Sequence, residues 1–153
     1  MTATPAALES LLSLQGKAAL VTGAAAGIGQ AIAYRMAEAG ADLVLADRSA
    51  EGLAAARTRL EPFGRHVAAH TVDLSDMGAI YALWEELSQD PPDILVNNAG
   101  IFPSRHFDQV DEEFYDQVLG VNLDAVFWMC QGLIRKRGRR GGVIVNIGSI
   151  EAI

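Results

Sequence analysis

Short apolar runs alternate along the chain with longer segments in which apolar residues recur at helical spacing. The short runs predict strands, and the periodic segments predict helices. This alternation is typical of an α/β domain, in which crossover helices join parallel strands. The predicted strands are residues 18–21, 42–46, 67–72, 94–96 and 143–147, and the predicted helices are 27–39, a segment after Ser49, 76–88 and 112–136, behind a leucine-rich leader at 5–14.

Particular residues mark the ends of these elements. Gly40 follows the first helix, where glycine readily adopts the left-handed conformation, and Gly138 is predicted to end the long helix. Ser49 is a good N-cap residue for the second helix. The pair Pro91-Pro92 stops the third helix before the fourth strand, because proline cannot continue a helix.

The apolar strands predict a sheet that is buried on both faces, and right-handed crossovers place helices on both sides of it. We therefore expect one three-layer domain, residues 1–153, with a doubly wound parallel sheet in the strand order 3-2-1-4-5. In that order the fifth strand, rich in Val and Ile, forms an exposed edge close to the last residue. Proteins normally cover such an edge, so the pattern predicts a domain truncated after the fifth strand.

Composition mainly excludes classes of partner. The chain has 153 residues, enough for one buried core, and a net charge of −7 that disfavours nucleic acid and anionic membranes. The basic run at residues 135–140 is predicted to complement the negative end of the long helix rather than to bind a polyanion. With no run of about 18 apolar residues and no basic amino-terminal region, we expect no membrane span and a cytoplasmic location.

Histidine and cysteine give no sign of a metal site or a disulfide. His66, His70 and His106 lack the paired spacing of metal ligands. Cys130 is the only cysteine, and it lies in the apolar run 125–130, which favours a packed thiol over a nucleophile.

A glycine-rich turn, Gly23–Gly29, joins the first strand to the first helix with the spacing GxxxGxG. Glycines allow the backbone to approach a pyrophosphate closely, and a helix N-terminus offers free N–H groups and a positive dipole end. Tight strand-to-helix packing is the alternative explanation, but the position favours phosphate binding. The predicted pyrophosphate-binding residues are Gly23, Ala26, Gly27, Ile28 and Gly29.

Asp47 follows the second strand, at the position where an acidic residue meets the adenosine ribose in dinucleotide-binding domains. Its carboxylate would accept hydrogen bonds from both ribose hydroxyls and repel a 2′-phosphate, and the glycine-rich turn contains no Lys or Arg. Arg48 could instead stack on adenine or bind a phosphate, and a solvated loop carboxylate is the simpler explanation of Asp47. The charge argument favours NAD over NADP.

Four motifs in order make the chain resemble the short-chain dehydrogenase/reductase family over nearly its whole length. They are Thr22–Gly29, Asp73-Leu74, Asn97–Gly100 and Val145–Ser149, each at the matching place among the predicted elements. The resemblance implies a Rossmann-type fold and an NAD-dependent oxidoreductase that transfers hydride between nicotinamide and a secondary alcohol or carbonyl. It also implies a small-molecule substrate and, for the complete form, a homo-oligomer.

The resemblance assigns further cofactor contacts. Asp73 would accept a hydrogen bond from the adenine amino group, and the Leu74 backbone would touch the ring. The segment Asn97–Gly100 would shape the cofactor wall and hold the fourth strand to its neighbours, although turn geometry is the alternative explanation for its asparagines. The residues of this segment assigned to the cofactor side are Asn98, Ala99 and Gly100.

By the same resemblance, Asn122 helps to hold a water in a proton relay and Ser149 hydrogen-bonds the substrate oxygen. Asn is a poor residue for a helix interior, so its place at 122 invites a specific explanation, whereas Ser149 could be an ordinary turn residue. The family's Tyr-x-x-x-Lys pair is absent from the sequence, and we expect the chain alone to lack rapid turnover, since a general acid–base group contributes about 10²–10⁴-fold. The alternatives are a non-catalytic dinucleotide-binding protein and a fragment whose fifth strand pairs with another chain.

Overall fold

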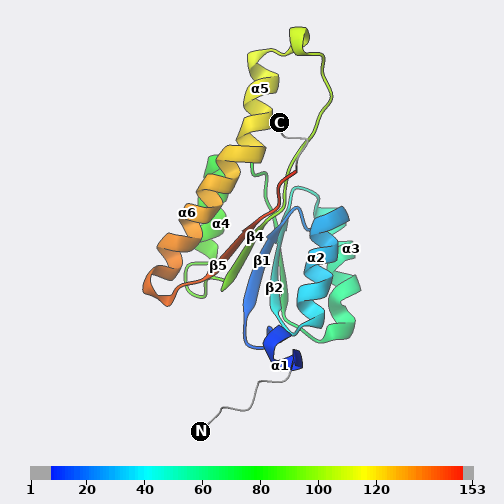
Figure 1. Ribbon diagram of the computed structural model, residues 1–153, viewed down its shortest axis with the longest axis vertical. Coiled ribbons are helices and arrows are strands. Elements are labelled where there is room, and N and C mark those ends of the chain that lie inside the picture. Colours follow the sequence, from blue (N-terminus) through cyan, green and yellow to red (C-terminus); the bar gives the residue numbers. More distant parts are fainter. Residues whose placement is uncertain (1–7, 150–153) are drawn as a thin grey trace.

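The computed structural model describes residues 8–149, in which five strands and the helices between them follow the predicted alternation (Figure 1). The start of the predicted leader, residues 5–7, lies outside the described residues. The strands are β1 (Ala18–Thr22), β2 (Asp42–Asp47), β3 (Val67–Thr71), β4 (Ile94–Asn97) and β5 (Val143–Asn146). The helices are α1 (Leu8–Leu12), α2 (Gly27–Glu38), α3 (Ala50–Leu60), α4 (Met77–Glu86), α5 (Glu112–Leu119) and α6 (Ala125–Arg137), with short helical turns η1 (Glu61–Phe63), η2 (Phe107–Gln109), η3 (Gly120–Asp124) and η4 (Gly138–Arg140).

The sheet has the predicted topology. All four strand pairings are parallel, and the order is β3-β2-β1-β4-β5. β1 is central, so Leu20 lies opposite Val44 of β2 on one side and Leu95 of β4 on the other. Because every strand runs the same way, all five carboxyl ends meet at one edge of the sheet (Figure 1).

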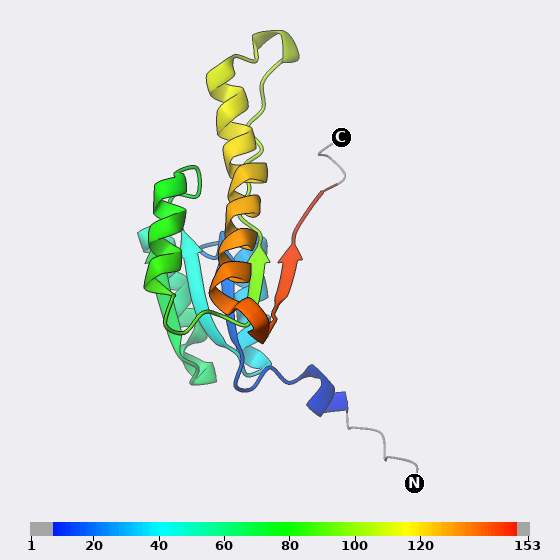
Figure 2. The same cartoon turned by 90° about the vertical axis from the view of Figure 1, so that its left-hand side faces the viewer.

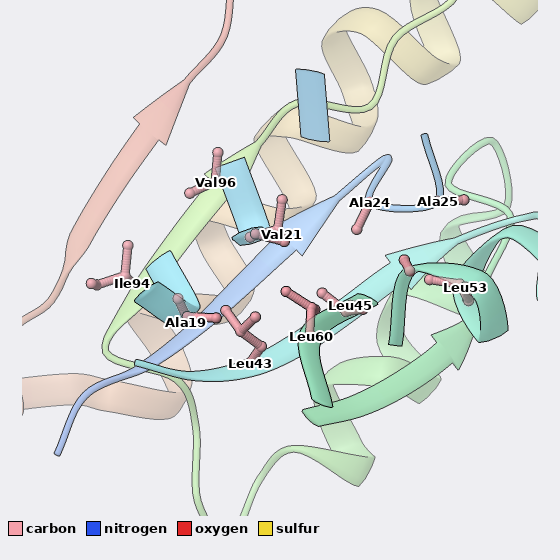
Figure 3. Close-up of a cluster of buried hydrophobic side chains, with 13 residues drawn as sticks. Ala19, Val21, Ala24, Ala25, Leu43, Leu45, Leu53, Leu60, Ile94 and Val96 are labelled. Atoms are coloured by element: carbon pink, nitrogen blue, oxygen red, sulfur yellow. The ribbon is translucent and has the colours of Figure 1, made fainter. Parts of the chain in front are cut away.

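Two apolar clusters fill the spaces between the sheet and its helices. On one face, α2 and α3 cover β1 and β2, with Val21, Leu45 and Leu53 among the side chains they enclose (Figure 3). On the other face, α4 and α6 pack over Leu20 and Leu95. Side chains alternate between the two faces along each strand, so a strand covered on both sides is apolar at consecutive positions.

The two outer strands differ from the prediction of burial on both faces. β4 is buried throughout and β1 nearly so, but β3 has only half-buried and exposed residues, and β5 exposes Val143 and Val145. An outer strand has one strand neighbour instead of two, so one of its long edges is open. An apolar strand sequence therefore does not by itself ensure burial.

The predicted helix ends at Gly40, Ser49 and Gly138 are confirmed, whereas α4 ends at Glu86, two residues before the predicted end and ahead of Pro91-Pro92. Gly40 follows α2 with a φ of +98°, and Gly138 follows α6 with a φ of +54°. The Ser49 hydroxyl accepts a hydrogen bond from the Gly52 N–H at 3.1 Å and so caps α3, as Asp76 caps α4. The side-chain caps accept hydrogen bonds from N–H groups that a helix start leaves unpaired. The glycines with positive φ turn the chain away from the helix axis at the helix end.

The long helix predicted at residues 112–136 has the expected extent but not a regular α geometry. Between α5 and α6 the chain makes the π-helical turn η3, and Asn122 lies at its centre. Asn is a poor α-helix former, and single π-helical turns occur frequently at functional sites. Figure 2 shows α5 extending past the carboxyl edge of the sheet.

By length and composition, the continuous helical segment Glu112–Arg140 is sufficient to cross a membrane, contrary to the expectation from the sequence. Its most apolar window has a mean hydropathy of 1.2, and 17% of that window is buried. Ala125, Met129 and Leu133 are the buried residues of α6 and join the cluster on the sheet. Length and composition alone are weak evidence for a membrane span, because core helices of globular proteins meet the same criteria.

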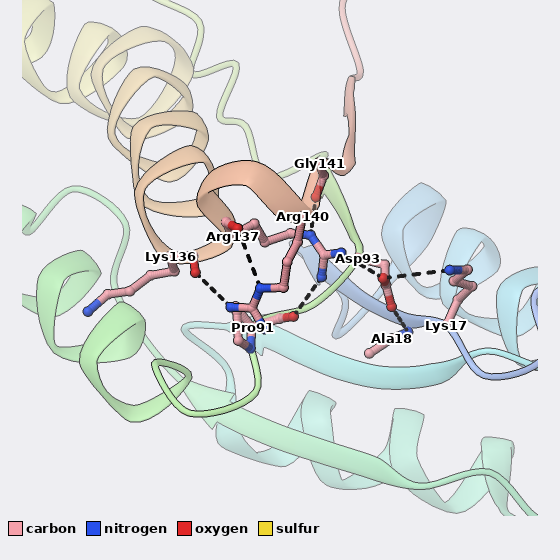
Figure 4. A network of polar contacts seen from close by, with 8 residues as sticks. All are labelled: Lys17, Ala18, Pro91, Asp93, Lys136, Arg137, Arg140 and Gly141. Atoms are coloured by element: carbon pink, nitrogen blue, oxygen red, sulfur yellow. Dashed lines mark hydrogen bonds and ion pairs between the residues drawn. The ribbon is translucent and has the colours of Figure 1, made fainter.

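The basic run forms contacts within the protein at the amino-end edge of the sheet (Figure 4). The Arg137 guanidinium lies 2.9 Å from the Asp93 carboxylate, which also accepts a hydrogen bond from the Ala18 N–H at 3.0 Å. Arg140 donates to the Lys136 carbonyl at 2.8 Å, where the helix leaves carbonyls unpaired. These contacts agree with the prediction that the basic run completes the end of the helix.

Candidate dinucleotide site

A groove opens at the carboxyl edge of the sheet, where the loops after β1, β2, β3 and β4 meet. In doubly wound sheets a crevice forms at this edge because the strand order reverses, here between β1 and β4. The lining residues that the sequence predicted are Gly23, Asp47, Arg48, Asp73, Leu74, Ala99 and Gly100. The other three lining residues are the apolar Val72, Ile101 and Val121, and neither valine was assigned a role from the sequence.

The turn after β1 is folded so tightly that only glycine fits at two of its positions. Gly23 has a φ of +64°, in the left-handed region. A Cβ on Gly29 would lie 2.2 Å from the Gly23 carbonyl oxygen and 2.5 Å from Asn98 Nδ2. Ala26 makes no side-chain cap hydrogen bond, so α2 begins with backbone groups alone. Bare N–H groups at a helix N-terminus fit a pyrophosphate.

The remaining residues of the predicted pyrophosphate loop are not part of the groove lining. Ala26, Gly27 and Ile28 are exposed, and Gly29 is buried beneath them. The first backbone hydrogen bond of the helix runs from the Gln30 N–H to the Ala26 carbonyl at 3.2 Å. The N–H groups of residues 27–29 precede that bond and belong to the turn in which a helix has no internal acceptors.

Asp47 is the last residue of β2, whereas the sequence predicted that the strand ends at Ala46 and that Asp47 follows it. Its Oδ2 accepts a hydrogen bond from the Ala25 N–H at 3.0 Å, and its Oδ1 accepts one from the Ser49 N–H at 2.9 Å. The carboxylate therefore holds the glycine-rich turn and the start of α3 together while it lines the groove. It is not a solvated loop residue.

Asp73 and Leu74 follow β3 and line the same groove. The Ser75 hydroxyl donates to the Asp73 carboxylate at 2.7 Å and the Ser75 N–H at 2.9 Å, and both hydrogen bonds lower the pKa of that carboxyl below its ordinary value. The positive charge of Arg48 lowers it further. Asp73 is thus held as an acceptor, which suits an adenine amino group.

The Asn98 side chain lies behind the groove, not in its lining. Its Nδ2 donates to the carbonyls of Thr22 and Gly23 at 3.0 and 3.3 Å. The Thr22 hydroxyl accepts the N–H groups of Asn98 and Ala99, each at 3.0 Å, and donates to the Val96 carbonyl at 3.3 Å. The predicted attachment of β4 to its neighbour is present, and Thr22 is the residue that sequence reasoning left without a role.

Asn97 connects β4 to the outer strand. Its Nδ2 donates to Asn146 Oδ1 of β5 at 2.8 Å and contacts the Cys130 sulfur at 3.3 Å. Burial raises the pKa of the Cys130 thiol, and the Asn97 contact only partly opposes this. A raised pKa keeps the thiol protonated, so the geometry agrees with the predicted packed cysteine and not with a nucleophile.

Asn122 uses its side chain to hold the loop that follows β4. Its Nδ2 donates to the Ile101 carbonyl at 2.8 Å, and its Oδ1 accepts from the Ile101 N–H at 2.9 Å. Both polar ends of the amide are therefore bonded to one residue of the groove wall. Ser149 is exposed three residues after the end of β5, at the carboxyl edge. The predicted roles of both residues in catalysis stay predictions.

Comparison with known proteins identifies the family. A family model described as short chain dehydrogenase matches residues 17–153. Gluconate 5-dehydrogenase from Gluconobacter oxydans (strain 621H) is 37% identical over 145 residues, covering 93% of this chain and 57% of the relative. The 2-dehydro-3-deoxy-D-gluconate 5-dehydrogenase of Bacillus subtilis (strain 168) is 40% identical over 145 residues, covering 94% and 57%. The crystal structure of L-sorbose reductase from Gluconobacter frateurii, complexed with NADPH and L-sorbose, is similar with a TM-score of 0.87 and 33% identity, covering 93% of this chain and 56% of that one.

The fold, the groove and these matches agree on one class of protein. The chain belongs to the short-chain dehydrogenase family, which confirms the resemblance seen in the motifs. Members of this family are oxidoreductases that bind a nicotinamide dinucleotide. The chain spans 57% of the length of the two relatives, so the activities of the whole relatives enter only as proposals below.

Proposed function

We propose that this protein binds a nicotinamide dinucleotide in the groove and that its reaction interconverts a secondary alcohol and a carbonyl. The observation that carries the proposal is the tight glycine-rich turn placed beside Asp47 and Asp73 in one groove. The pyrophosphate would lie over Gly23–Gly29 and the adenosine near the two carboxylates. Titration calorimetry with NADH tests this placement, and an absence of saturable binding would contradict it.

The dinucleotide supplies or accepts the hydride, and the protein supplies binding and orientation. In this proposal Ser149 donates a hydrogen bond to the substrate oxygen, while Asn122 keeps the groove wall in place through Ile101. Because the sequence contains no Tyr-x-x-x-Lys pair, these residues alone would orient a substrate without rapid proton transfer. The relatives compared above are dehydrogenases and a reductase, which supports an oxidoreductase over a non-catalytic dinucleotide-binding protein.

For the cofactor we propose a preference for NAD over NADP. Asp47 places a carboxylate in the groove at the end of β2, where the ribose hydroxyls would lie, and this charge would repel a 2′-phosphate. Arg48 lines the same groove, and the similar L-sorbose reductase was solved with NADPH, so a protein of this fold accepts the 2′-phosphate. The balance between the Asp47 and Arg48 charges is then what sets the preference.

Replacing Asp47 by asparagine is expected to shift the ratio of the NADH and NADPH dissociation constants by at least about tenfold toward NADPH, because a charge-assisted hydrogen bond and the repulsion are lost. The asparagine side chain keeps one oxygen, for the Ala25 N–H, so the glycine-rich turn stays held, whereas the Ser49 N–H loses its acceptor. Asp47→Ala is the comparison, and it should also weaken both dinucleotides. Calorimetric titration measures the constants; an unchanged ratio in Asp47→Asn would remove Asp47 as the selector.

We further propose that the protein is cytoplasmic and acts on a small molecule, without a nucleic-acid or membrane partner. The net charge of −7 supports this, since the long-range field repels polyanions. The basic run adds support because Arg137 and Arg140 are engaged within the protein.

We also propose that two copies associate through the exposed side of the long helix. Four apolar side chains on this side are each more than half exposed: Tyr115, Leu123, Phe127 and Ile134. The spacings between successive members are eight, four and seven residues. This is close to a heptad pattern, because the π-helical turn adds one residue to the first spacing. The pairs Tyr115/Ile134 and Leu123/Phe127 are both centred within one residue of Ala125. An antiparallel copy would therefore place each member of a pair opposite the other, as a two-fold interface requires.

Charge supports the same antiparallel arrangement. The helix begins with four acidic residues and ends with the basic run, of which Arg135 and Arg139 are exposed, so each acidic end would meet these two arginines of the partner. The acidic residues are Asp111, Glu112, Glu113 and Asp116.

Phe127→Glu is expected to weaken self-association by at least about tenfold, because a buried aromatic contact would be replaced by a charge at the centre of the interface. Leu11→Glu is the matched control, since Leu11 is 68% exposed in the separate helix α1. Analytical ultracentrifugation over a concentration series gives the dissociation constants. Equal constants for wild type and Phe127→Glu would exclude this interface.

A further inference from the structure

Ala25 is the point at which neighbouring elements hold the glycine-rich turn. Its N–H donates to Asp47, and its carbonyl accepts a hydrogen bond from Gln30 Nε2 at 3.0 Å. Its methyl group lies against Gly52 in the first turn of α3, where an added Cβ would be only 2.7 Å away. Ala25 is buried within the cluster that includes Leu53 (Figure 3). Both backbone groups and the side chain of this residue are therefore fixed.

Gln30 is itself held at its other end. Its Oε1 accepts a hydrogen bond from the Arg59 guanidinium of α3 at 2.5 Å. The Gln30 amide thus spans from α3 to the glycine-rich turn, and its oxygen and its nitrogen each have a partner. An amide bonded at both ends cannot rotate without breaking one of the two bonds, so Arg59 keeps the Gln30 N–H directed at the Ala25 carbonyl.

The orientation of one peptide unit follows from this contact. In a trans peptide the carbonyl and the following N–H point in opposite directions within one plane. Gln30 binds the Ala25 carbonyl, so the Ala26 N–H must point away from Gln30. Ala26 precedes the first residue of α2, at the position where an N–H contributes to anion binding.

We propose that Gln30, held by Arg59, is a positioning residue for the dinucleotide site, which directs the Ala26 N–H toward the pyrophosphate without touching the ligand. This inference rests on the function proposed above. It adds two residues from outside the motifs and the groove lining, since neither Gln30 nor Arg59 belongs to either.

The test compares the affinity for NADH, which contains the pyrophosphate, with the affinity for adenosine, which does not. Gln30→Met keeps the length of the side chain and removes both hydrogen bonds, and Arg59→Met releases the Gln30 oxygen only. Each variant is expected to bind NADH about three- to tenfold more weakly, the effect of one lost hydrogen bond, and to bind adenosine as wild type does. Adenosine carries no pyrophosphate, so it reports the pocket at Asp47 and Asp73 alone. Nitrogen-15 NMR titration with each ligand gives the affinities, and the Ala26 amide resonance should shift in both variants before ligand is added.

Arg57→Met is the matched control. Arg57 is exposed in the same helix as Arg59, and the substitution removes the same positive charge. Its NADH affinity is expected to stay within about twofold of wild type. Equal losses for NADH and adenosine, or unchanged NADH affinity in Gln30→Met, would overturn the positioning role while leaving the dinucleotide site intact. If wild-type protein binds adenosine but not NADH, the proposed function fails first, and the two failures are distinguishable.

Discussion

Replacing Gly29 by alanine is expected to lower NADH affinity by at least about tenfold and to lower the free energy of unfolding by about 3 kcal/mol, the upper part of the usual range for overpacking. The reason lies within the protein: the new Cβ would be 2.2 Å from the Gly23 carbonyl oxygen. Because that oxygen is backbone and Asn98 Nδ2 lies on the same side at 2.5 Å, the contact cannot be relieved by rotating one flexible side chain. The turn itself must move.

Gly120→Ala is the control for Gly29→Ala. An added Cβ at Gly120 meets nothing within 4 Å, and the residue has no positive φ. In a helical position this change should be neutral or slightly stabilising, since alanine is the better helix former. Urea unfolding gives the stabilities and calorimetry gives the NADH affinities. A Gly29→Ala variant with wild-type stability and affinity would show that the tight turn is wrongly described.

Thr22→Val is expected to lower the free energy of unfolding by about 2–4 kcal/mol, although the two side chains have nearly the same shape. Thr22 is 1% exposed, and its hydroxyl accepts the N–H groups of Asn98 and Ala99. Valine would leave these two part-buried N–H groups and the buried Val96 carbonyl without that partner. Each unsatisfied buried group costs about 1–3 kcal/mol.

Thr22→Ser separates the hydroxyl from the methyl group. Serine keeps all three hydrogen bonds and loses one buried methyl group, so the expected cost is about 1 kcal/mol. Denaturant unfolding of both variants gives the comparison. If Thr22→Val were as stable as Thr22→Ser, the connection between β1 and the loop after β4 would not depend on the hydroxyl. The groove should also suffer in Thr22→Val, because Ala99 is part of its lining.

The order of the elements and the edge on which the site lies were predictable from local sequence. The strand runs, the glycines Gly40 and Gly138 at helix ends and the N-cap Ser49 each depend on neighbours in the chain, and all appear in the structure. Parallel strands bring their carboxyl ends together whatever their side chains are. Residues at the end of a strand or just after it, such as Asp47 and Asp73, therefore meet in one groove.

Burial of the strands could not be predicted in the same way. β5 is as apolar as β4, yet β4 is buried and β5 is largely exposed. The difference comes from place in the sheet: β4 lies between two strands, and β5 has one neighbour. Likewise, the Asn122 amide at the interruption of the long helix bonds to the backbone of Ile101, 21 positions earlier, and no local pattern predicts this contact.

The sequence by itself determined the topology and the chemistry available at the carboxyl edge, because strand period, turn residues and charge act over a few neighbouring positions. Only the tertiary structure decided how that edge is held. Thr22 bonds the loop after β4, and Gln30 reaches Arg59 on the next helix, pairs separated by 76 and 29 positions. Such residues carry no local signal, since a threonine or glutamine becomes a structural contact only when folding places an unpaired backbone group or side chain within hydrogen-bonding distance.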